Sequence, residues 1–200
     1  MPFSNRKIIN LYTPLDEKIL LSLNAGDEVL LTGEVFTARD QAHKRLLELM
    51  KRKARLPLDL KGQMVYYCGP TKTAPGKVIG SCGPTTSARM DRLTAPLLSC
   101  GLKGMIGKGR RSEEVRQQIK KHKAVYFLAI GGAGAFLAKR VVAAKPLCFK
   151  ELGPEAVYKL NVRDFPLIVG IDAKGCDIFD CQRKRKLQAS NPKHQIISKF

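Results

Sequence analysis

Two hydroxyls and an arginine follow a glycine–proline turn in the stretch IGSCGPTTSARMDRL, residues 79–93. Thr85 or Thr86 can cap a helix that begins directly after the turn. A helix N-terminus carries free backbone N–H groups and partial positive charge, so this segment could bind an anion. Arg89 falls in the predicted first turn, where the helix dipole disfavours a cation. Either Asp91 or a bound carboxylate or phosphate would compensate it, and an ordinary strand–turn–helix with a surface arginine is an equal alternative.

A second arginine occupies a comparable position earlier in the chain. Arg39 lies at the predicted junction between a strand and a helix that Asp40 caps, and His43 follows in the first turn. A guanidinium can bind a carboxylate through two parallel hydrogen bonds, so Arg39 is a candidate for holding an acidic ligand. On residue types alone, a solvated surface arginine is the favoured alternative.

Two glycine-rich segments complete the candidate sites. Lys108 lies between Gly107 and Gly109, which would let the backbone and the lysine approach an anion closely. The segment is not a Walker A loop, because no Ser or Thr follows the lysine, and a surface turn is the alternative. Residues 131–134, GGAG, resemble part of a dinucleotide-binding fingerprint, but Leu137 stands where that fingerprint requires glycine or alanine. Close packing of a helix on a strand explains them better.

The chain is strongly basic. Its formal net charge is +19, from 36 lysines and arginines against 17 acidic residues, so it should attract nucleic acid, an acidic protein or a small anionic substrate. The basic residues gather at 51–55, 107–111 and 182–186. Tryptophan is absent and aromatic residues make up 6% of the chain, which leaves few platforms for stacking single-stranded RNA. A basic RNA-binding module remains an alternative function.

Apolar periodicity alternates between strands and helices, which predicts an α/β layered domain. Helices are expected to begin after Asp16, Asp40 and Ser112, and another over 131–142. Strands are expected within 28–38, 62–70, 77–84, 124–130 and 156–179, with two strands each in the first and last of these segments.

Length and composition predict a single domain over residues 1–181, followed by a loose basic tail at 182–200. No run approaches the roughly 18 apolar residues that span a membrane. The first residues lack the order of a secretion signal, so we expect a cytoplasmic protein. The six cysteines contain no C-x-x-C pair, which favours buried, reduced thiols over a metal site.

Five segments carry a resemblance to a known family. In chain order they are VFTARDQAHKRL, GSCGPTTSARMD, GMIGKGRRSEEV, YFLAIGGAGAFLAKRV and KELGPEAVYKLNVRDFPLIVGID. Together they resemble the β subunit of class I, iron–sulfur-dependent hydro-lyases. That family contains two-subunit fumarate hydratases and L-tartrate dehydratases, and the same unit is the C-terminal domain of single-chain class I fumarases. The resemblance runs from about Thr13 to Asp172, and GPTTSARMD is its most specific part. Ala88 departs from the glycine that many relatives carry there.

The resemblance implies a swivelling β/β/α domain, with three layers and a mainly parallel central sheet. It implies a [4Fe–4S] cluster ligated by a partner α subunit, so that this chain supplies no metal ligand, and a heterodimer or heterotetramer as the assembly. The implied reaction is reversible addition of water to a four-carbon dicarboxylate, fumarate/(S)-malate or tartrate. A membrane or a nucleic acid is not an expected partner on this reading.

The resemblance also implies roles for individual residues. Thr85 would be the proton acceptor, assisted by an acid of the α subunit, and Thr86 would cap the helix or donate a hydrogen bond. His43 and Asp40 would support Arg39. The residues implied to line the substrate are Arg39, Thr85, Thr86, Arg89 and Lys108.

Overall fold

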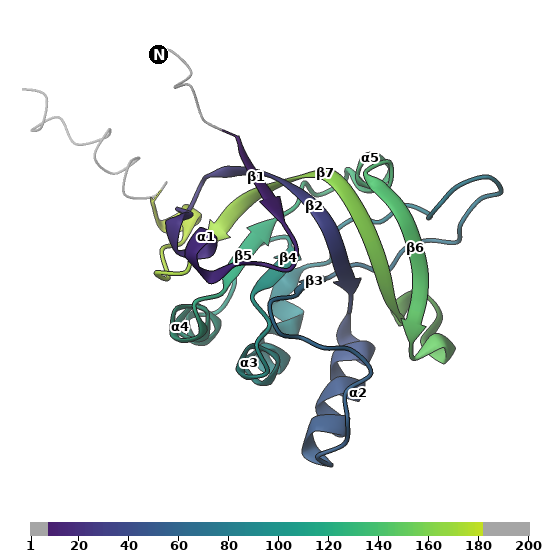
Figure 1. The fold of residues 1–200 in the computed structure, drawn as a ribbon, viewed down its shortest axis with the longest axis horizontal. Helices are drawn as coiled ribbons and strands as arrows, with labels where there is room; N and C mark the ends of the chain where they lie inside the picture. The colour runs from purple at the N-terminus through teal and green to yellow at the C-terminus, as the bar shows by residue number, and fades with distance from the viewer. Residues whose placement is uncertain (1–7, 182–200) are drawn as a thin grey trace, which may run out of the picture.

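A computed structural model describes residues 8–181. They contain one mixed sheet with the strand order β1-β2-β3-β4-β5-β7-β6 (Figure 1). Strands β1 to β5 run parallel to one another, whereas β7 is antiparallel to β2, β5 and β6. The strands are β1 Ile9–Tyr12, β2 Glu28–Thr37, β3 Met64–Tyr66, β4 Gly104–Gly107, β5 Val125–Leu128, β6 Val141–Cys148 and β7 Val157–Ile171.

The sheet closes on itself because β7 pairs with both β2 and β5. Strands β2, β3, β4, β5 and β7 therefore form a five-stranded barrel, with β1 and β6 as extensions. This confirms an α/β fold but differs from the expected three layers around a mainly parallel sheet. The cause is β7, which has 15 residues and register shifts against each of its three partners. Such irregularities bend a strand, and the bend lets β7 follow the barrel wall.

The structure corrects further strand predictions. Segment 28–38 contains one strand instead of two, because a register shift at Gly33 (φ +124°) keeps β2 continuous. Segment 156–179 also holds one strand, β7. Segment 77–84 is not a strand. Its first part belongs to a loop, residues 71–81, whose two ends are joined by two hydrogen bonds that form the neck of the loop. The Thr71 N–H donates to the Ser81 carbonyl at 3.0 Å, and the Ser81 N–H donates to Thr71 Oγ1 at 2.9 Å.

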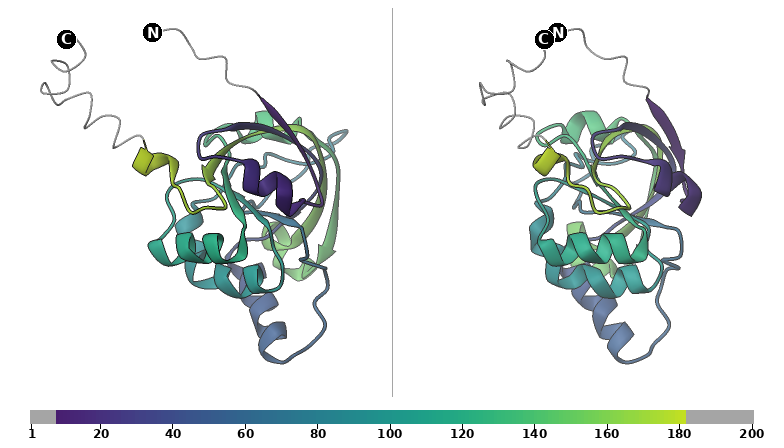
Figure 2. Two further views of the ribbon diagram at one scale, coloured as in Figure 1. Left: turned by 60° about the vertical axis from the view of Figure 1, so that its left-hand side comes forward. Right: turned by 90° about the vertical axis from the view of Figure 1, so that its left-hand side faces the viewer.

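The helices lie mostly at one side of the barrel, where α2, α3 and α4 come together (Figures 1 and 2). Asp16 and Ser112 cap α1 and α4 as predicted. Within residues 8–181, no helix has the length and apolar character to cross a membrane. The helices are α1 Glu17–Ser22, α2 Asp40–Lys51, α3 Asp91–Ser99, α4 Glu113–His122 and α5 Gly134–Ala138, with 3₁₀ turns η1 Ser87–Met90 and η2 Lys150–Glu155.

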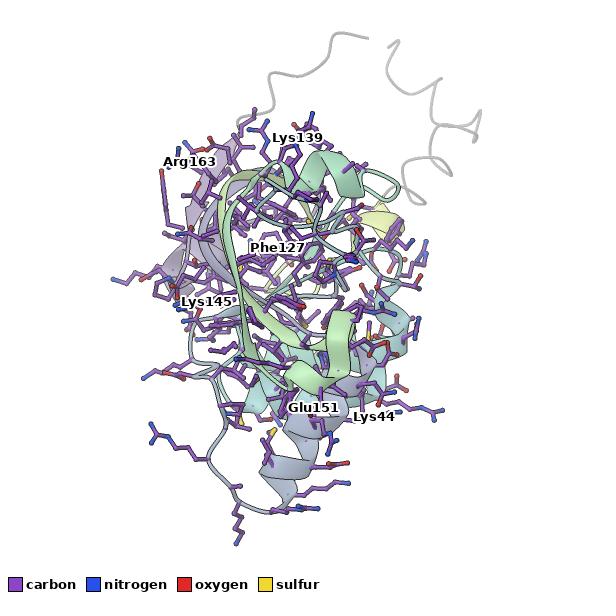
Figure 3. All side chains as sticks on the ribbon, turned by 90° about the vertical axis from the view of Figure 1, so that its right-hand side faces the viewer. Lys44, Phe127, Lys139, Lys145, Glu151 and Arg163 are labelled. Carbon is purple, nitrogen blue, oxygen red and sulfur yellow. The ribbon has the colours of Figure 1, made fainter. Side chains whose placement is uncertain are left out.

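Alternation along the strands divides the apolar residues between two cores. Side chains such as Phe127 fill the barrel, whereas charged residues such as Lys145 and Arg163 point outward (Figure 3). Across the barrel, the rings of Tyr66 and Phe165 meet edge to face with centroids 5.6 Å apart. The opposite face of β2 to β5 packs on α2, α3 and α4. The second core thus fixes these three helices to the sheet.

A buried ion pair joins the starts of α3 and α4. The Arg111 guanidinium donates from Nε to Asp91 at 2.6 Å and from Nη2 to Thr94 at 2.8 Å. The second Asp91 oxygen accepts the Ser112 N–H at 2.7 Å. The side chain of Arg111 is 0% exposed, so one member of the basic cluster 107–111 belongs to the core.

Removing Arg111 should therefore destabilise the protein strongly. In Arg111→Ala, Asp91 keeps a largely buried charge without its partner, so the free energy of unfolding should fall by about 3–5 kcal/mol. The matched control is Arg110→Ala, because Arg110 is exposed and pairs with Asp180 at the surface. It should cost less than about 1 kcal/mol. Urea unfolding measures both, and equal losses would contradict the assignment.

Candidate functional site

The predicted site residues gather where parallel strands end. Arg39 follows β2 by two residues, and Lys108 comes directly after β4. Thr85 is held to the end of β3, because its N–H donates to the Tyr67 carbonyl at 2.7 Å. Ligands commonly bind outside the carboxyl ends of parallel strands in α/β proteins. The three segments therefore share one rim of the sheet.

Arg89 reaches across this rim to the start of α2. Its Nε donates to Asp40 Oδ1 at 3.1 Å, and its Nη2 lies 3.0 Å from Asp40 Oδ2. Because Asp40 directly follows Arg39 after β2, this contact brings Arg89 to the end of the same strand. It also corrects two expectations: Asp40 is the first residue of α2 instead of its cap, and Asp91 is bound by Arg111 and is no partner of Arg89. Arg89 belongs to the turn η1, ahead of α3.

The loop after β4 that carries Lys108 is hydrogen-bonded to the segment that carries Thr85 and Thr86. Thr86 and Lys108 form a parallel bridge, and the Ser87 N–H donates to the Lys108 carbonyl at 3.0 Å. The Tyr126 hydroxyl lies 2.9 Å from both the Ser87 hydroxyl and the Gly109 carbonyl. Because a carbonyl only accepts, Tyr126 donates to Gly109 and accepts from Ser87. Burial raises the pKa of Tyr126, so the phenol stays protonated and keeps this bond.

His43 lies beneath the site and is fully buried. Its Nδ1 is 2.8 Å from the Arg39 carbonyl and must carry the proton, since that oxygen only accepts. The ring meets Tyr67 edge-on, with centroids 5.5 Å apart. Burial lowers the pKa of His43 to about 4, although the bond to Arg39 opposes the shift. A neutral His43 therefore contacts the backbone of Arg39 and does not face solvent.

The cysteines are divided between the core and the surface. Cys68 and Cys82 are buried, at the ends of the segments that precede the site. The expectation of buried thiols is wrong for the other four, since Cys148 is half-buried and Cys100, Cys176 and Cys181 are exposed. The adjacent Cys82 and burial raise the pKa of Cys68, which favours the thiol form. Between residues 8 and 181, no group of three or more His, Cys, Asp or Glu side chains is placed to hold a metal ion.

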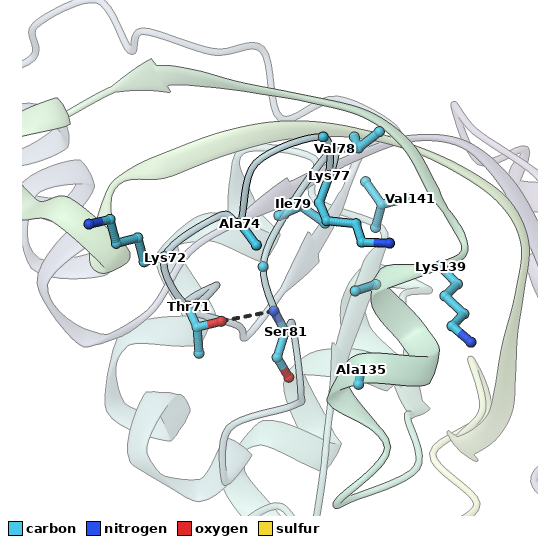
Figure 4. A pocket seen from close by; sticks show the side chains of 13 residues that line it. Thr71, Lys72, Ala74, Lys77, Val78, Ile79, Ser81, Ala135, Lys139 and Val141 are labelled. Atoms are coloured by element: carbon cyan, nitrogen blue, oxygen red, sulfur yellow. Dashed lines mark hydrogen bonds between the residues drawn. The ribbon is translucent and has the colours of Figure 1, made fainter.

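A cavity of about 610 Å³ lies between the loop 71–81, α5 and the start of β6 (Figure 4). Lys72, Lys77 and Lys139 line it, and the predicted site residues do not. Nearby, a Cβ on Gly134 would lie 2.8 Å from the Gly83 nitrogen. Gly134 of the GGAG segment therefore serves close packing, although it packs against the loop at Gly83 and not against a strand as predicted.

The basic clusters are not equivalent. Residues 51–55 are exposed at the end of α2 and beyond it, whereas Arg111 of the cluster 107–111 is buried. The cluster 182–186, with the whole predicted tail 182–200, lies outside the described residues.

Comparison with known proteins identifies the family. The family model described as "Fumarase C-terminus" matches residues 3–182. The chain belongs to the fumarase C-terminus family. This confirms the resemblance that the five sequence segments indicated.

Relatives within the fumarase C-terminus family are named for two activities. The chain is 36% identical to "Putative L(+)-tartrate dehydratase subunit beta" of Methanocaldococcus jannaschii over 186 residues, which are 90% of this chain and 95% of that protein. It is 39% identical to "Fumarate hydratase 2" of Leishmania major over 86% of its own length and 31% of the relative. For "Fumarate hydratase class I, anaerobic" of Escherichia coli the identity is 39%, over 86% of this chain and 32% of the relative. The chain thus spans about a third of those fumarate hydratases.

Several residues of the candidate site were not predicted from the sequence. Tyr126 and Ser87 tie the two loops together, and Glu155 lies beside Arg39 with 3.6 Å between Oε1 and Nη2. A tyrosine within the apolar run AVYFLAI was a usable signal, because a buried phenol needs a hydrogen-bond partner. Nothing local to Glu155 indicates its partner, which lies more than a hundred residues earlier.

The buried His43 should make stability depend on pH. Its folded pKa of about 4 lies below the ordinary 6.5, so the unfolded chain binds the proton first as pH falls. The stabilisation is complete above pH 6.5 and is lost as pH falls toward 4. Between pH 7 and pH 5 the free energy of unfolding should drop by about 2 kcal/mol more in the wild type than in His43→Gln. Urea unfolding at the two pH values measures this difference.

His122→Gln is the matched control, because His122 is only partly buried at the end of α4. Its substitution should leave most of the pH dependence in place. If His43→Gln showed the same pH dependence as the wild type, His43 would not be the buried neutral group described above.

Proposed function

We propose that this chain is the β subunit of a two-subunit hydro-lyase that reversibly adds water to fumarate to give (S)-malate. The observation that carries the proposal is the contact of Arg89 with Asp40, the residue that directly follows Arg39 at the end of β2. Lys108 adds a third cation on the adjoining loop. Membership of the fumarase C-terminus family supports the same reaction class.

The cations suit a four-carbon dicarboxylate. Arg39, Arg89 and Lys108 would hold the two carboxylates, and a guanidinium can do so with two parallel hydrogen bonds. In the dehydration direction, a base takes the proton from the carbon next to one carboxylate. Negative charge then builds on that carboxylate, and cations already aimed at it lower the barrier. Loss of hydroxide from the neighbouring carbon completes the double bond.

Thr85 is the proposed proton acceptor on this chain. Its side chain is half-buried and its backbone is held by the bond to Tyr67. A threonine hydroxyl is a poor base by itself, so we propose that an acidic residue of the α subunit assists it. Thr86 precedes η1, and its side chain makes no capping bond. We therefore propose that the Thr86 hydroxyl donates a hydrogen bond to the substrate.

The remaining parts of the enzyme are assigned to the α subunit. The described residues of this chain do not fit an iron–sulfur cluster, since they contain no three-ligand group. We propose that the α subunit ligates a [4Fe–4S] cluster, which would supply Lewis-acid chemistry at the hydroxyl that leaves. The proposed assembly is a heterodimer or heterotetramer in the cytoplasm.

Tartrate is the second candidate substrate. The relative from Methanocaldococcus jannaschii, of which the chain covers 95%, carries a tartrate dehydratase name. Tartrate presents the same two carboxylates, so the cations of this chain suit either substrate. We propose that contacts from the α subunit make the choice, and assays of the complex with both substrates decide it.

Substitution of Arg89 tests the proposed function. The purified chain should show no fumarate hydration, and the complex with an α subunit and an anaerobically rebuilt cluster should be active. In that complex Arg89→Ala should lower kcat/KM at least about 100-fold, because a cation aimed at the developing charge is lost.

Arg92→Ala is the matched control, since Arg92 is exposed one helical turn further on. It should leave fumarate hydration within about twofold of the wild type, a small effect of the kind expected for a surface position. Near-wild-type activity of Arg89→Ala would refute the assigned site. An inactive wild-type complex would refute the proposed reaction.

A further inference from the structure

The helix α2 begins without a cap of its own. Arg39 occupies the N-cap position, and its side chain makes no capping bond. The N–H groups in the first turn of a helix have no partner within the helix. One of them, at Gln41, donates to Glu155 Oε2 at 2.9 Å. Glu155 at the end of η2 therefore supplies the missing cap from a distant part of the chain.

The same carboxylate faces the Arg39 side chain. Glu155 Oε1 lies 3.6 Å from Arg39 Nη2, and the two side chains are only 23% and 24% exposed. The guanidinium is confined on another side by the turn after β3, because a Cβ on Gly69 would lie 2.8 Å from Arg39 Nη1. Glu155 and Gly69 together thus limit the directions in which the guanidinium can point.

Glu155 is itself held in place by the end of β2. The hydroxyl of Thr37, which is fully buried, donates to the Ala156 carbonyl at 3.3 Å and accepts the Tyr158 N–H at 2.9 Å. Thr37 is the last residue of β2 and stands two residues before Arg39. The residue that holds Arg39 is therefore fastened to the same strand end that carries Arg39.

We propose that Glu155 is a positioning residue that sets the direction of the Arg39 guanidinium toward the substrate carboxylate. This inference rests on the proposed function. Each arginine of the site would then be oriented by one carboxylate, Arg89 by Asp40 and Arg39 by Glu155. Each arginine keeps further donors for a ligand, since a guanidinium has five N–H groups.

A double-mutant cycle in the reconstituted α–β complex tests the inference. Glu155→Gln removes the charge that attracts Arg39, whereas its amide oxygen can still accept the Gln41 N–H. If the Arg39 guanidinium points toward the substrate in only a fraction of the molecules, the apparent affinity for substrate falls by that fraction. We expect the KM for fumarate to rise about tenfold, with kcat changed less than about threefold and Tm nearly unchanged, because Arg39 holds the carboxylate before and during the reaction.

The second arm of the cycle separates positioning from structure. In an Arg39→Ala background, Glu155→Gln should change KM less than about twofold, because the group it orients is gone. Glu155→Ala, which also loses the cap, should lower Tm in both backgrounds. Glu151→Gln is the matched control, because Glu151 is an exposed acid of the same turn (Figure 3), and it should behave as the wild type.

The outcomes distinguish this inference from the proposed function. An active wild-type complex in which Glu155→Gln leaves KM unchanged, or changes it equally with and without Arg39, overturns the role of Glu155 alone. A wild-type complex without hydro-lyase activity overturns the proposed function, and the role of Glu155 in it falls as well.

Discussion

The antiparallel pairing of β7 with β2 is the interaction on which the rest of this structure depends. It closes the barrel, and it does so with β2, β3, β4 and β5 all parallel, so their carboxyl ends meet at one rim. The pairing aligns Phe36 with Lys159, which places the turn before β7 against the start of α2. Arg39 and Glu155 meet because of this register. A slip of one residue would turn every side chain of β7 to the other face and separate the two.

The site combines fixed backbone segments with charged side chains at its surface. Tyr126 binds both Ser87 and the Gly109 carbonyl, so it joins the two loops that carry Thr85 and Lys108. Beneath them His43 is buried and neutral at physiological pH. Much of the positive charge of the rim is therefore carried by guanidinium groups, which keep their proton in proteins. Such a rim should keep its attraction for dianions over a wide range of pH.

Much of the site was predictable because its motifs are local. The caps Asp16 and Ser112 are recognisable from neighbouring residues, and the five resembling segments indicated the family. The closure of the sheet was not predictable in this way, since alternation in segment 156–179 is the same for one bent strand or two straight ones. The partners of ion pairs were even harder to predict from the sequence. Asp91 lies two residues from Arg89 yet binds Arg111, because burial and not sequence distance selects the partner.

The loop between Thr71 and Ser81 has one more consequence. Its neck is closed by two hydrogen bonds, and a Cβ on Gly80 would collide with the Thr71 carbonyl. Residues 71–78 are all exposed beyond that neck. Because these bonds fix the two ends of the loop, a change of sequence within the loop should leave the position of the following residues, including Thr85, unchanged. Since doubling the length of a flexible loop costs only about 0.6 kcal/mol, this loop is a natural place to insert a peptide tag or a reporter group without disturbing the rim.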